Sequence, residues 1–142
     1  ESLRLEKGYR SLGSDIHTNT NPYESGLGFT VKLKKDDDFI GKEALAKIKQ
    51  QPIEKKLACM VLDDPEGMAL GTEPIYSDGK AVSYVTSTNY GYFVDKHIVY
   101  GYLPKDLSDE GTKLELEYFG KRYPLTVTQE PLLDPENSRL KS

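Results

Sequence analysis

The sequence lacks the residues that disulfides and zinc sites need. Its 142 residues include one cysteine, Cys59, two histidines, His17 and His97, and no tryptophan. A single cysteine excludes an internal disulfide and a CxxC motif, and so few ligands argue against a structural zinc site. No apolar run approaches the roughly 20 residues that a membrane-spanning helix needs, so we expect no membrane partner.

Several ligand-binding motifs are also missing. There is no GxxxxGK[ST] loop, no HExxH motif and no EF-hand spacing, and the aspartates of 36–38 favour a solvated turn. Gly26-Leu27-Gly28 lacks the third glycine of a dinucleotide-binding loop and precedes a predicted strand. A formal net charge of -4 and a pI near 5.2 argue against nucleic acid, whose binding proteins present a basic face.

The first 54 residues combine helical and strand patterns. Apolar residues over 5–12 follow helical spacing and predict a helix that Gly13 ends. Alternating apolar and polar residues over 29–33 predict a half-buried strand, and residues 43–49 predict a second helix. These elements are too few to form an independent core.

Five or six short strands with turns between them are predicted over 55–130. Residues 55–62 alternate between two apolar faces, and Asp78-Gly79 between two apolar runs is a strong hairpin signal. Residues 119–121 predict a further turn, and the tail from Glu130 is expected to be extended. This pattern is typical of a small antiparallel barrel or sandwich.

Residue chemistry alone assigns no catalytic site. Five tyrosines between 84 and 102 could stack on a flat heterocycle, but we favour strand residues that line a barrel. The first helix is crowded with charge, and although Arg4 could pair with a ligand carboxylate, we favour a solvated charged face. Its charged residues are Glu1, Arg4, Glu6, Lys7 and Arg10. Cys59 is expected to be a small buried hydrophobe, His97 a surface residue, and His17 has no recognisable nucleophile beside it.

Five strings stand out in the sequence: SLRLEKGYR at 2–10, NPYESGLG at 21–28, DFIGKEAL at 38–45, GKAV at 79–82 and VTS at 85–87. Together they resemble the T-protein (aminomethyltransferase) family of the glycine cleavage system. The resemblance covers essentially the whole chain, and the start and the ending over 120–132 are similar to dimethylglycine and sarcosine dehydrogenases. It implies the end of a folate-binding α+β domain at 1–54, incomplete here, and an all-β antiparallel barrel at 55–142.

The resemblance implies an enzyme in which a flavin half is joined to a folate half. The flavin half, with FAD, oxidises an N-methylated glycine to an iminium, and the T-protein half receives that carbon on tetrahydrofolate as 5,10-methylenetetrahydrofolate. The carboxylate that handles protons in the family lies upstream of the matched region. We therefore expect no catalytic residue and no metal ligand here, and no activity from the segment alone. The expected partners are the substrate and the rest of the parent chain.

The resemblance carries over two cofactor-binding candidates. Tyr9 matches a position that approaches the folate in family members, and Arg139 in the tail could reach a folate carboxylate. Arg4 and Asp15 match motif positions that fix the helix and the loop after it. Thr88 stands where many members have glycine, and a positive φ there would strain it.

Two other functions stay open. A flavin-free aminomethyltransferase would take its carbon from a lipoyl carrier, and a regulatory relative would keep the fold without the chemistry. The chain begins at Glu1 inside a helical pattern, so we expect a segment of a longer protein. The cytoplasm is the default location, because no targeting segment is visible.

Overall fold

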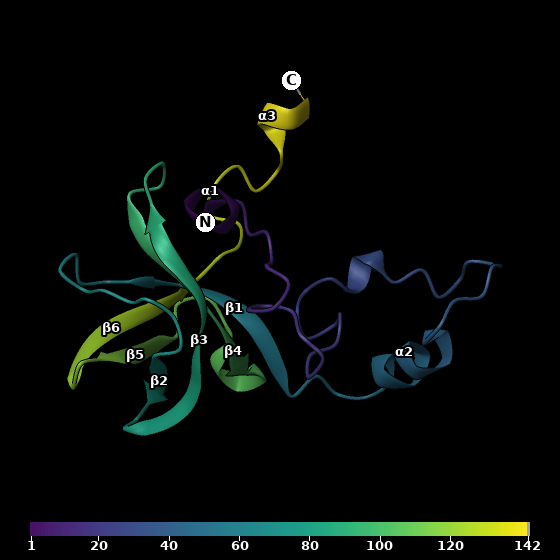
Figure 1. The fold of residues 1–142 in the computed structure, drawn as a ribbon, viewed down its shortest axis with the longest axis horizontal. Helices are drawn as coiled ribbons and strands as arrows, with labels where there is room; N and C mark the ends of the chain where they lie inside the picture. The colour runs from purple at the N-terminus through teal and green to yellow at the C-terminus, as the bar shows by residue number, and fades with distance from the viewer. Residues whose placement is uncertain (142) are drawn as a thin grey trace.

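A six-stranded antiparallel barrel dominates the computed structural model, which describes residues 1–141 (Figure 1). The strands follow one another around the closed barrel in the order β1-β4-β3-β2-β5-β6, and β6 pairs back onto β1. This confirms the expected fold class of a mixed segment followed by an all-β barrel. The elements are α1 (Ser2–Glu6), η1 (Gly28–Thr30), α2 (Lys42–Lys49), β1 (Lys55–Leu62), β2 (Pro74–Ser77), β3 (Lys80–Gly91), β4 (Lys96–Pro104), η2 (Lys105–Leu107), β5 (Lys113–Tyr118), β6 (Lys121–Thr128) and α3 (Ser138–Lys141).

Strand β1 buries both of its faces, as its two apolar faces predict. One face contributes to the barrel core, where side chains from all six strands meet. The other face contributes Leu57 and Cys59 to a second cluster, which also contains Leu5 of α1 and Ile98 and Tyr100 of β4. This second cluster packs the amino-terminal segment onto the outside of the barrel, since burial of apolar surface drives the contact. The β1 residues in the barrel core are Ala58, Met60 and Leu62.

Two hairpins confirm the predicted turns. Asp78 and Gly79 have φ of 48° and 77° between β2 and β3, and Phe119 and Gly120 have φ of 47° and 73° between β5 and β6. Positive φ at both central residues gives the turn that matches the twist of paired strands. Thr88 lies in β3, pairs with Val99 and has no positive φ, so the strain considered for it is absent.

The first helix is shorter than predicted. It ends at Glu6 and not near Gly13, because Gly8 adopts a φ of 73° just beyond it. The amide of Gly8 donates to the Leu5 carbonyl at 3.1 Å, and the amide of Tyr9 donates to the Arg4 carbonyl at 2.8 Å. This pair of hydrogen bonds is a Schellman motif, which ends a helix at a glycine and turns the chain sharply.

The predicted strand over 29–33 is wrong. Residues Gly28–Thr30 form the 3-10 helix η1, and the chain then continues without regular structure. The amides of Thr30 and Val31 donate to the carbonyls of Leu27 and Gly28. A strand needs a neighbour, and the closed barrel pairs each of its strands on both sides, which leaves no edge for another.

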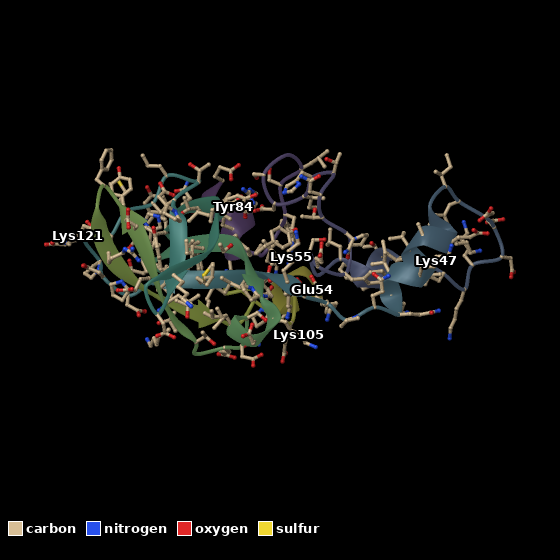
Figure 2. The ribbon with its side chains drawn as sticks, turned by 90° about the horizontal axis from the view of Figure 1, so that it is seen from below. Lys47, Glu54, Lys55, Tyr84, Lys105 and Lys121 are labelled. Carbon is tan, nitrogen blue, oxygen red and sulfur yellow. The ribbon has the colours of Figure 1, made fainter. Side chains whose placement is uncertain are left out.

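Residues 28–53 extend away from the barrel as an arm that carries η1 and α2 (Figure 1). The view from below agrees: Lys47 on α2 lies far from Lys121 at the opposite end, with Glu54 and Lys55 between them (Figure 2). The tail after β6 returns past α1 and ends in α3 (Figure 1). The proposed domain limits of 1–54 and 55–142 stay a prediction, and residue 142 lies outside the described residues.

Substitution of Leu116 by alanine should destabilise the barrel, because this side chain is 0% exposed in its core. We expect Leu116→Ala to lower the free energy of unfolding by about 2–5 kcal/mol in urea denaturation. Leu70, at 72% exposed, is the matched control, and Leu70→Ala should cost less than about 0.5 kcal/mol. Equal losses for the two variants would contradict the core described above.

Candidate functional site

Arg4 joins α1 to the loop after it and to strand β3. Its Nη1 donates to Asp15 Oδ2 at 2.8 Å and to the Tyr9 carbonyl at 3.0 Å, and its Nη2 donates to Ser87 Oγ at 2.9 Å. Burial lowers the pKa of Arg4, but the hydrogen bond with Glu1 and the charge of Asp15 outweigh burial and raise it above its usual value. Arg4 therefore stays charged and holds three segments together.

Asp15 completes this arrangement from the loop. It is only 1% exposed, and its carboxylate also accepts the Ser11 amide at 3.0 Å and the Thr86 hydroxyl at 2.7 Å. Three donors, from the Arg4 guanidinium, the Ser11 amide and the Thr86 hydroxyl, thus surround one buried carboxylate. The structure agrees with the view that Arg4 and Asp15 fix the helix and the loop.

Glu6 holds the tip of the β3–β4 hairpin against α1. Its Oε1 accepts the backbone amides of Phe93 at 2.6 Å and Val94 at 3.3 Å. The residue is buried, and its Oε2 has no hydrogen-bond partner within residues 1–141. The Glu6 carboxylate thus accepts hydrogen bonds from two backbone amides of the hairpin turn and holds this turn against α1.

Lys7 binds the returning tail. Its Nζ donates to the Asp134 carbonyl at 2.6 Å and approaches Asp134 Oδ2 at 3.3 Å. Hydrogen bonds from Ser138 first, and from Lys7, lower the pKa of Asp134 to about 2 although some desolvation opposes them. The tail amide of Leu133 also donates to the Glu6 carbonyl at 2.9 Å.

Arg10 binds the tail at a second point. Its guanidinium forms an ion pair with Glu130, with Nη2 at 3.0 Å from Oε2, and its Nε donates to the Ser25 carbonyl at 3.0 Å. The hydroxyl of Tyr100 donates to Glu130 Oε1 at 3.1 Å from inside the second cluster. The prediction of a solvated charged face was therefore wrong for Arg4, Glu6, Lys7 and Arg10, because each binds a distant segment.

A groove of about 620 Å³ lies between the turn after α1, the turn before η1 and the tail. The tail contacts of Lys7 and Arg10 form one of its walls, so the ion pairs shape the groove. It combines aromatic and apolar surface with several cations and one carboxylate. Its lining residues are Lys7, Gly8, Tyr9, Arg10, Ile16, Gly26, Leu27, Phe29, Lys56, Glu130, Pro131, Pro135 and Asn137.

The two predicted cofactor-binding residues occupy different places. Tyr9 lines the groove and is 58% exposed, so its ring is available to a ligand. The Arg139 guanidinium lies over the Phe93 ring, with its carbon 4.7 Å from the ring centroid. Arg139 is not among the residues of 1–141 that line the groove, and the structure does not bring it together with Tyr9 there. Folate binding by either residue stays a prediction.

Three groove residues escaped the sequence reasoning. Phe29 was assigned to a half-buried strand, but its side chain is exposed and faces the groove. Lys56 is the second residue of β1, and Asn137 lies two residues before Arg139 in the tail. The one signal in the sequence that pointed to the groove was the pair of motif strings at 2–10 and 21–28, because residues of both strings line it.

The tyrosines of β3 and β4 divide into buried and exposed groups. Tyr100 belongs to the second cluster, where burial raises the pKa of its phenol. Tyr102 packs against the same cluster and donates its hydroxyl to the Asp15 carbonyl at 2.6 Å. Tyr84 and Tyr90 of β3 are exposed, and so is Tyr92, which lies in the turn between β3 and β4. Four of the five tyrosines lie on barrel strands as expected, but none of the five belongs to the barrel core or lines the groove, so they do not line the barrel interior.

The remaining candidates have structural surroundings. Cys59 is buried as predicted, and burial raises the pKa of its thiol to about 12. His97 is half-buried and not a surface residue, and its Nε2 lies 2.9 Å from Thr88 Oγ1. Burial lowers the pKa of His97. Within residues 1–141 no group of three histidine, cysteine or carboxylate side chains could hold a metal ion.

The fold and the groove define a barrel module whose amino-terminal segment and tail form a ligand-sized groove on its outside. The chain belongs to the glycine cleavage T-protein family: residues 55–134 match the glycine cleavage T-protein C-terminal barrel domain. Residues 1–35 match the GCVT N-terminal domain. The family predicted from the motif strings is thereby confirmed.

Named relatives agree with this family. Mouse mitochondrial dimethylglycine dehydrogenase is 42% identical over 98% of this chain, and mouse mitochondrial sarcosine dehydrogenase is 35% identical over 99% of it. The chain spans 16% of the length of each. The crystal structure of glycine cleavage system aminomethyltransferase T from Bartonella henselae matches 94% of this chain with a TM-score of 0.86 and 27% identity. This chain spans 38% of that protein.

The length and hydropathy of the helices test the expectation that this chain has no membrane-spanning helix. No helix within residues 1–141 is both long enough and apolar enough to cross a membrane. The cytoplasm as the location stays a prediction, and the two mouse dehydrogenases are mitochondrial by name.

Removal of the Asp15 carboxylate should detach the loop from α1 and β3. We expect Asp15→Ala to lower the free energy of unfolding by about 1–3 kcal/mol, because Arg4 and the Thr86 hydroxyl lose a buried partner. Asp37→Ala is the matched control, since its pair with Lys35 is exposed, and it should cost under about 1 kcal/mol. Urea denaturation of both variants measures the difference, and similar losses would contradict a structural role for Asp15.

The thiol of Cys59 should be inert in the folded protein. A pKa raised from 9.0 to about 12 lowers the thiolate fraction at pH 8 about a thousandfold, and the thiolate is the reactive form. Iodoacetamide should therefore label the native chain at least about a thousandfold more slowly than the chain in urea. Native labelling within about tenfold of the unfolded rate would show that Cys59 is accessible and reactive.

Proposed function

We propose that this chain is the carboxy-terminal part of an FAD-dependent dehydrogenase of dimethylglycine or sarcosine. In the parent protein it contributes to tetrahydrofolate binding and to one-carbon transfer that gives 5,10-methylenetetrahydrofolate. The observation that carries the proposal is the groove beside Tyr9. Tyr9 itself lies within the segment that matches the family's N-terminal domain. The identity with the two mouse dehydrogenases supports the flavin-dependent parent.

The groove suits the chemistry of tetrahydrofolate. A volume of about 620 Å³ lies in the range of roughly 300–1,000 Å³ that small-molecule sites occupy. Flat heterocycles and benzoyl rings pack on aromatic faces, which exposed Tyr9 and Phe29 present here. Folate also carries carboxylates, and Lys56 at the groove offers a cation for one of them.

Each residue of the groove then has a limited task. Tyr9 and Phe29 bind the flat part of the ligand, while Lys7 and Arg10 hold the tail that closes one side. The flavin, bound by the part of the parent that precedes residue 1, supplies the oxidation. No residue of this chain moves a proton in the reaction, so the segment alone is inactive and the parent is the enzyme.

A flavin-free aminomethyltransferase is the second candidate. The observation that favours it is the match of 94% of this chain to the Bartonella henselae aminomethyltransferase. A regulatory relative without chemistry remains the third. The visible spectrum of the parent protein separates them: flavin bands that N-methylated glycines bleach support the dehydrogenase, and a colourless protein supports the aminomethyltransferase. Flavin bands that no such substrate bleaches support the regulatory relative.

Variants of Tyr9 in the parent test the folate site. Tyr9→Phe should weaken tetrahydrofolate binding about two- to tenfold through the lost hydroxyl, and Tyr9→Ala about tenfold or more through the lost ring. Titration of tetrahydrofolate against protein fluorescence measures both. The rate at which dimethylglycine or sarcosine bleaches the flavin should not change, because that step belongs to the other half.

Tyr92→Ala is the matched control, because Tyr92 is exposed but does not line the groove. It should leave folate affinity within about twofold of the wild type. Unchanged affinity in Tyr9→Ala would remove Tyr9 from the site, and a collapse of flavin reduction in Tyr9→Phe would show that Tyr9 is structural.

A further inference from the structure

Glu130 lies where the tail meets the turn after α1. Its carboxylate accepts hydrogen bonds from both terminal nitrogens of Arg10, with Nη2 3.0 Å from Oε2, and from the Tyr100 hydroxyl at 3.1 Å. Both side chains of the ion pair are partly buried, and Tyr100 itself belongs to the second cluster. A carboxylate that a buried hydroxyl and a guanidinium hold from two sides has a fixed position, because its hydrogen bonds form one connected network.

The turn after α1 packs directly against this carboxylate. A Cβ atom at Gly8 would lie only 2.9 Å from Glu130 Oε1 and 3.1 Å from Glu130 Cγ, which is closer than side chains approach one another. Gly8 also has a φ of 73°, which glycine adopts without strain. The turn and Glu130 therefore fit together only because position 8 has no side chain.

Arg10 fills the space between two walls of the groove. Its Nη1 also donates to the Gly8 carbonyl, and its Nε donates to the Ser25 carbonyl at 3.0 Å. On the other side, a Cβ atom at Gly26 would lie 2.9 Å from Arg10 Nη2. Most N–H donors of the guanidinium are thus used by the chain itself. Although Arg10 lines the groove, it links the two turns and the tail and is not available as a cation for a ligand.

Tyr9 lies between the two residues that contact Glu130. Its amide donates to the Arg4 carbonyl at 2.8 Å, and its carbonyl accepts Arg4 Nη1 at 3.0 Å. Its neighbours Gly8 and Arg10 are held by Glu130. The Tyr9 ring, by contrast, is exposed and lines the groove. A ring on a fixed backbone binds a ligand at a smaller cost in conformational entropy than a ring on a mobile turn.

We propose that Glu130 is a positioning residue for the ligand of the groove. Through Arg10 and the turn at Gly8 it fixes the backbone of Tyr9, so that the Tyr9 ring is presented to the flat part of the ligand. Glu130 acts through Tyr9 and not through a contact of its own with the ligand. Binding of a folate to Tyr9 rests on the proposed function, whereas the fixed backbone of Tyr9 is independent of it.

Hydrogen exchange in the ligand-free parent tests the effect on the backbone. Glu130→Gln keeps the size of the side chain but removes the charge of the ion pair, so the amides of Gly8 and Tyr9 should exchange about tenfold faster or more. Glu117→Gln is the matched control, because Glu117 also pairs with an arginine, with Arg122 Nε at 2.8 Å, and does not line the groove. It should leave the exchange of the two amides within about twofold of the wild type.

Tyr100→Phe is the second variant, and it removes only the hydroxyl that anchors Glu130. It should speed the exchange of the Gly8 and Tyr9 amides in the same direction, while the slow amides of β1 report that the barrel stays folded. If Glu130→Gln also speeds the amides of β1, the barrel itself is loosened and Tyr100→Phe decides. Unchanged exchange at Gly8 and Tyr9 in the folded variants would overturn the proposal.

A double-mutant cycle on tetrahydrofolate affinity in the parent tests the path through Tyr9. Glu130→Gln alone should weaken binding about three- to tenfold, because the ring is no longer held in place. In the Tyr9→Ala background the same change should cost less than about twofold, since the ring that Glu130 positions is already absent. An equal loss in both backgrounds would show that Glu130 acts without Tyr9 and would overturn the proposal. Unchanged affinity in Tyr9→Ala would refute the proposed folate site and leave the exchange result on Glu130 standing.

Discussion

The buried carboxylate of Asp15 is the constraint on which the amino-terminal segment depends. A carboxylate that is removed from water must find charged or hydrogen-bonding partners, or its burial is very costly. Its partners come from α1, from its own loop and from β3, so these three parts can only be buried together. Because Tyr9 lies between Arg4 and Asp15 in the chain, the same contacts hold one wall of the groove in place.

The tail is positioned by ion pairs in addition to the apolar packing of Leu132 against the second cluster. Lys7 and Arg10 bind Asp134 and Glu130, and each pair joins positions more than a hundred residues apart. Ion pairs at partly buried sites are strongest where further hydrogen bonds accompany them, as the Tyr100 hydroxyl does for Glu130. The groove is thus formed by ion pairs between the two ends of the chain, and a ligand there would contact both ends.

Barrel and arm differ in how complete they are. The barrel closes on itself, fills its interior with apolar side chains from all six strands and leaves no strand edge. The arm buries little and has no sheet to join, which is why its apolar residues 29–33 form no strand. The barrel therefore has its own apolar core, whereas no residue of the arm at 28–53 is buried.

The sequence by itself determined the barrel strands, the turns at Asp78-Gly79 and 119–121, and the burial of Cys59. These features depend on neighbours two or three residues apart, where the alternation of side chains and the freedom of glycine act directly. The motif strings also pointed to Tyr9. They did not point to Phe29, and the alternation of apolar residues around it predicted a strand, because the same alternation can occur in a strand and in an exposed turn. Only the tertiary structure decided that the charges of α1 bind Asp15, the hairpin tip and the tail. Such contacts join residues up to 127 positions apart, and no local pattern distinguishes a charge that will be paired from one that will be solvated.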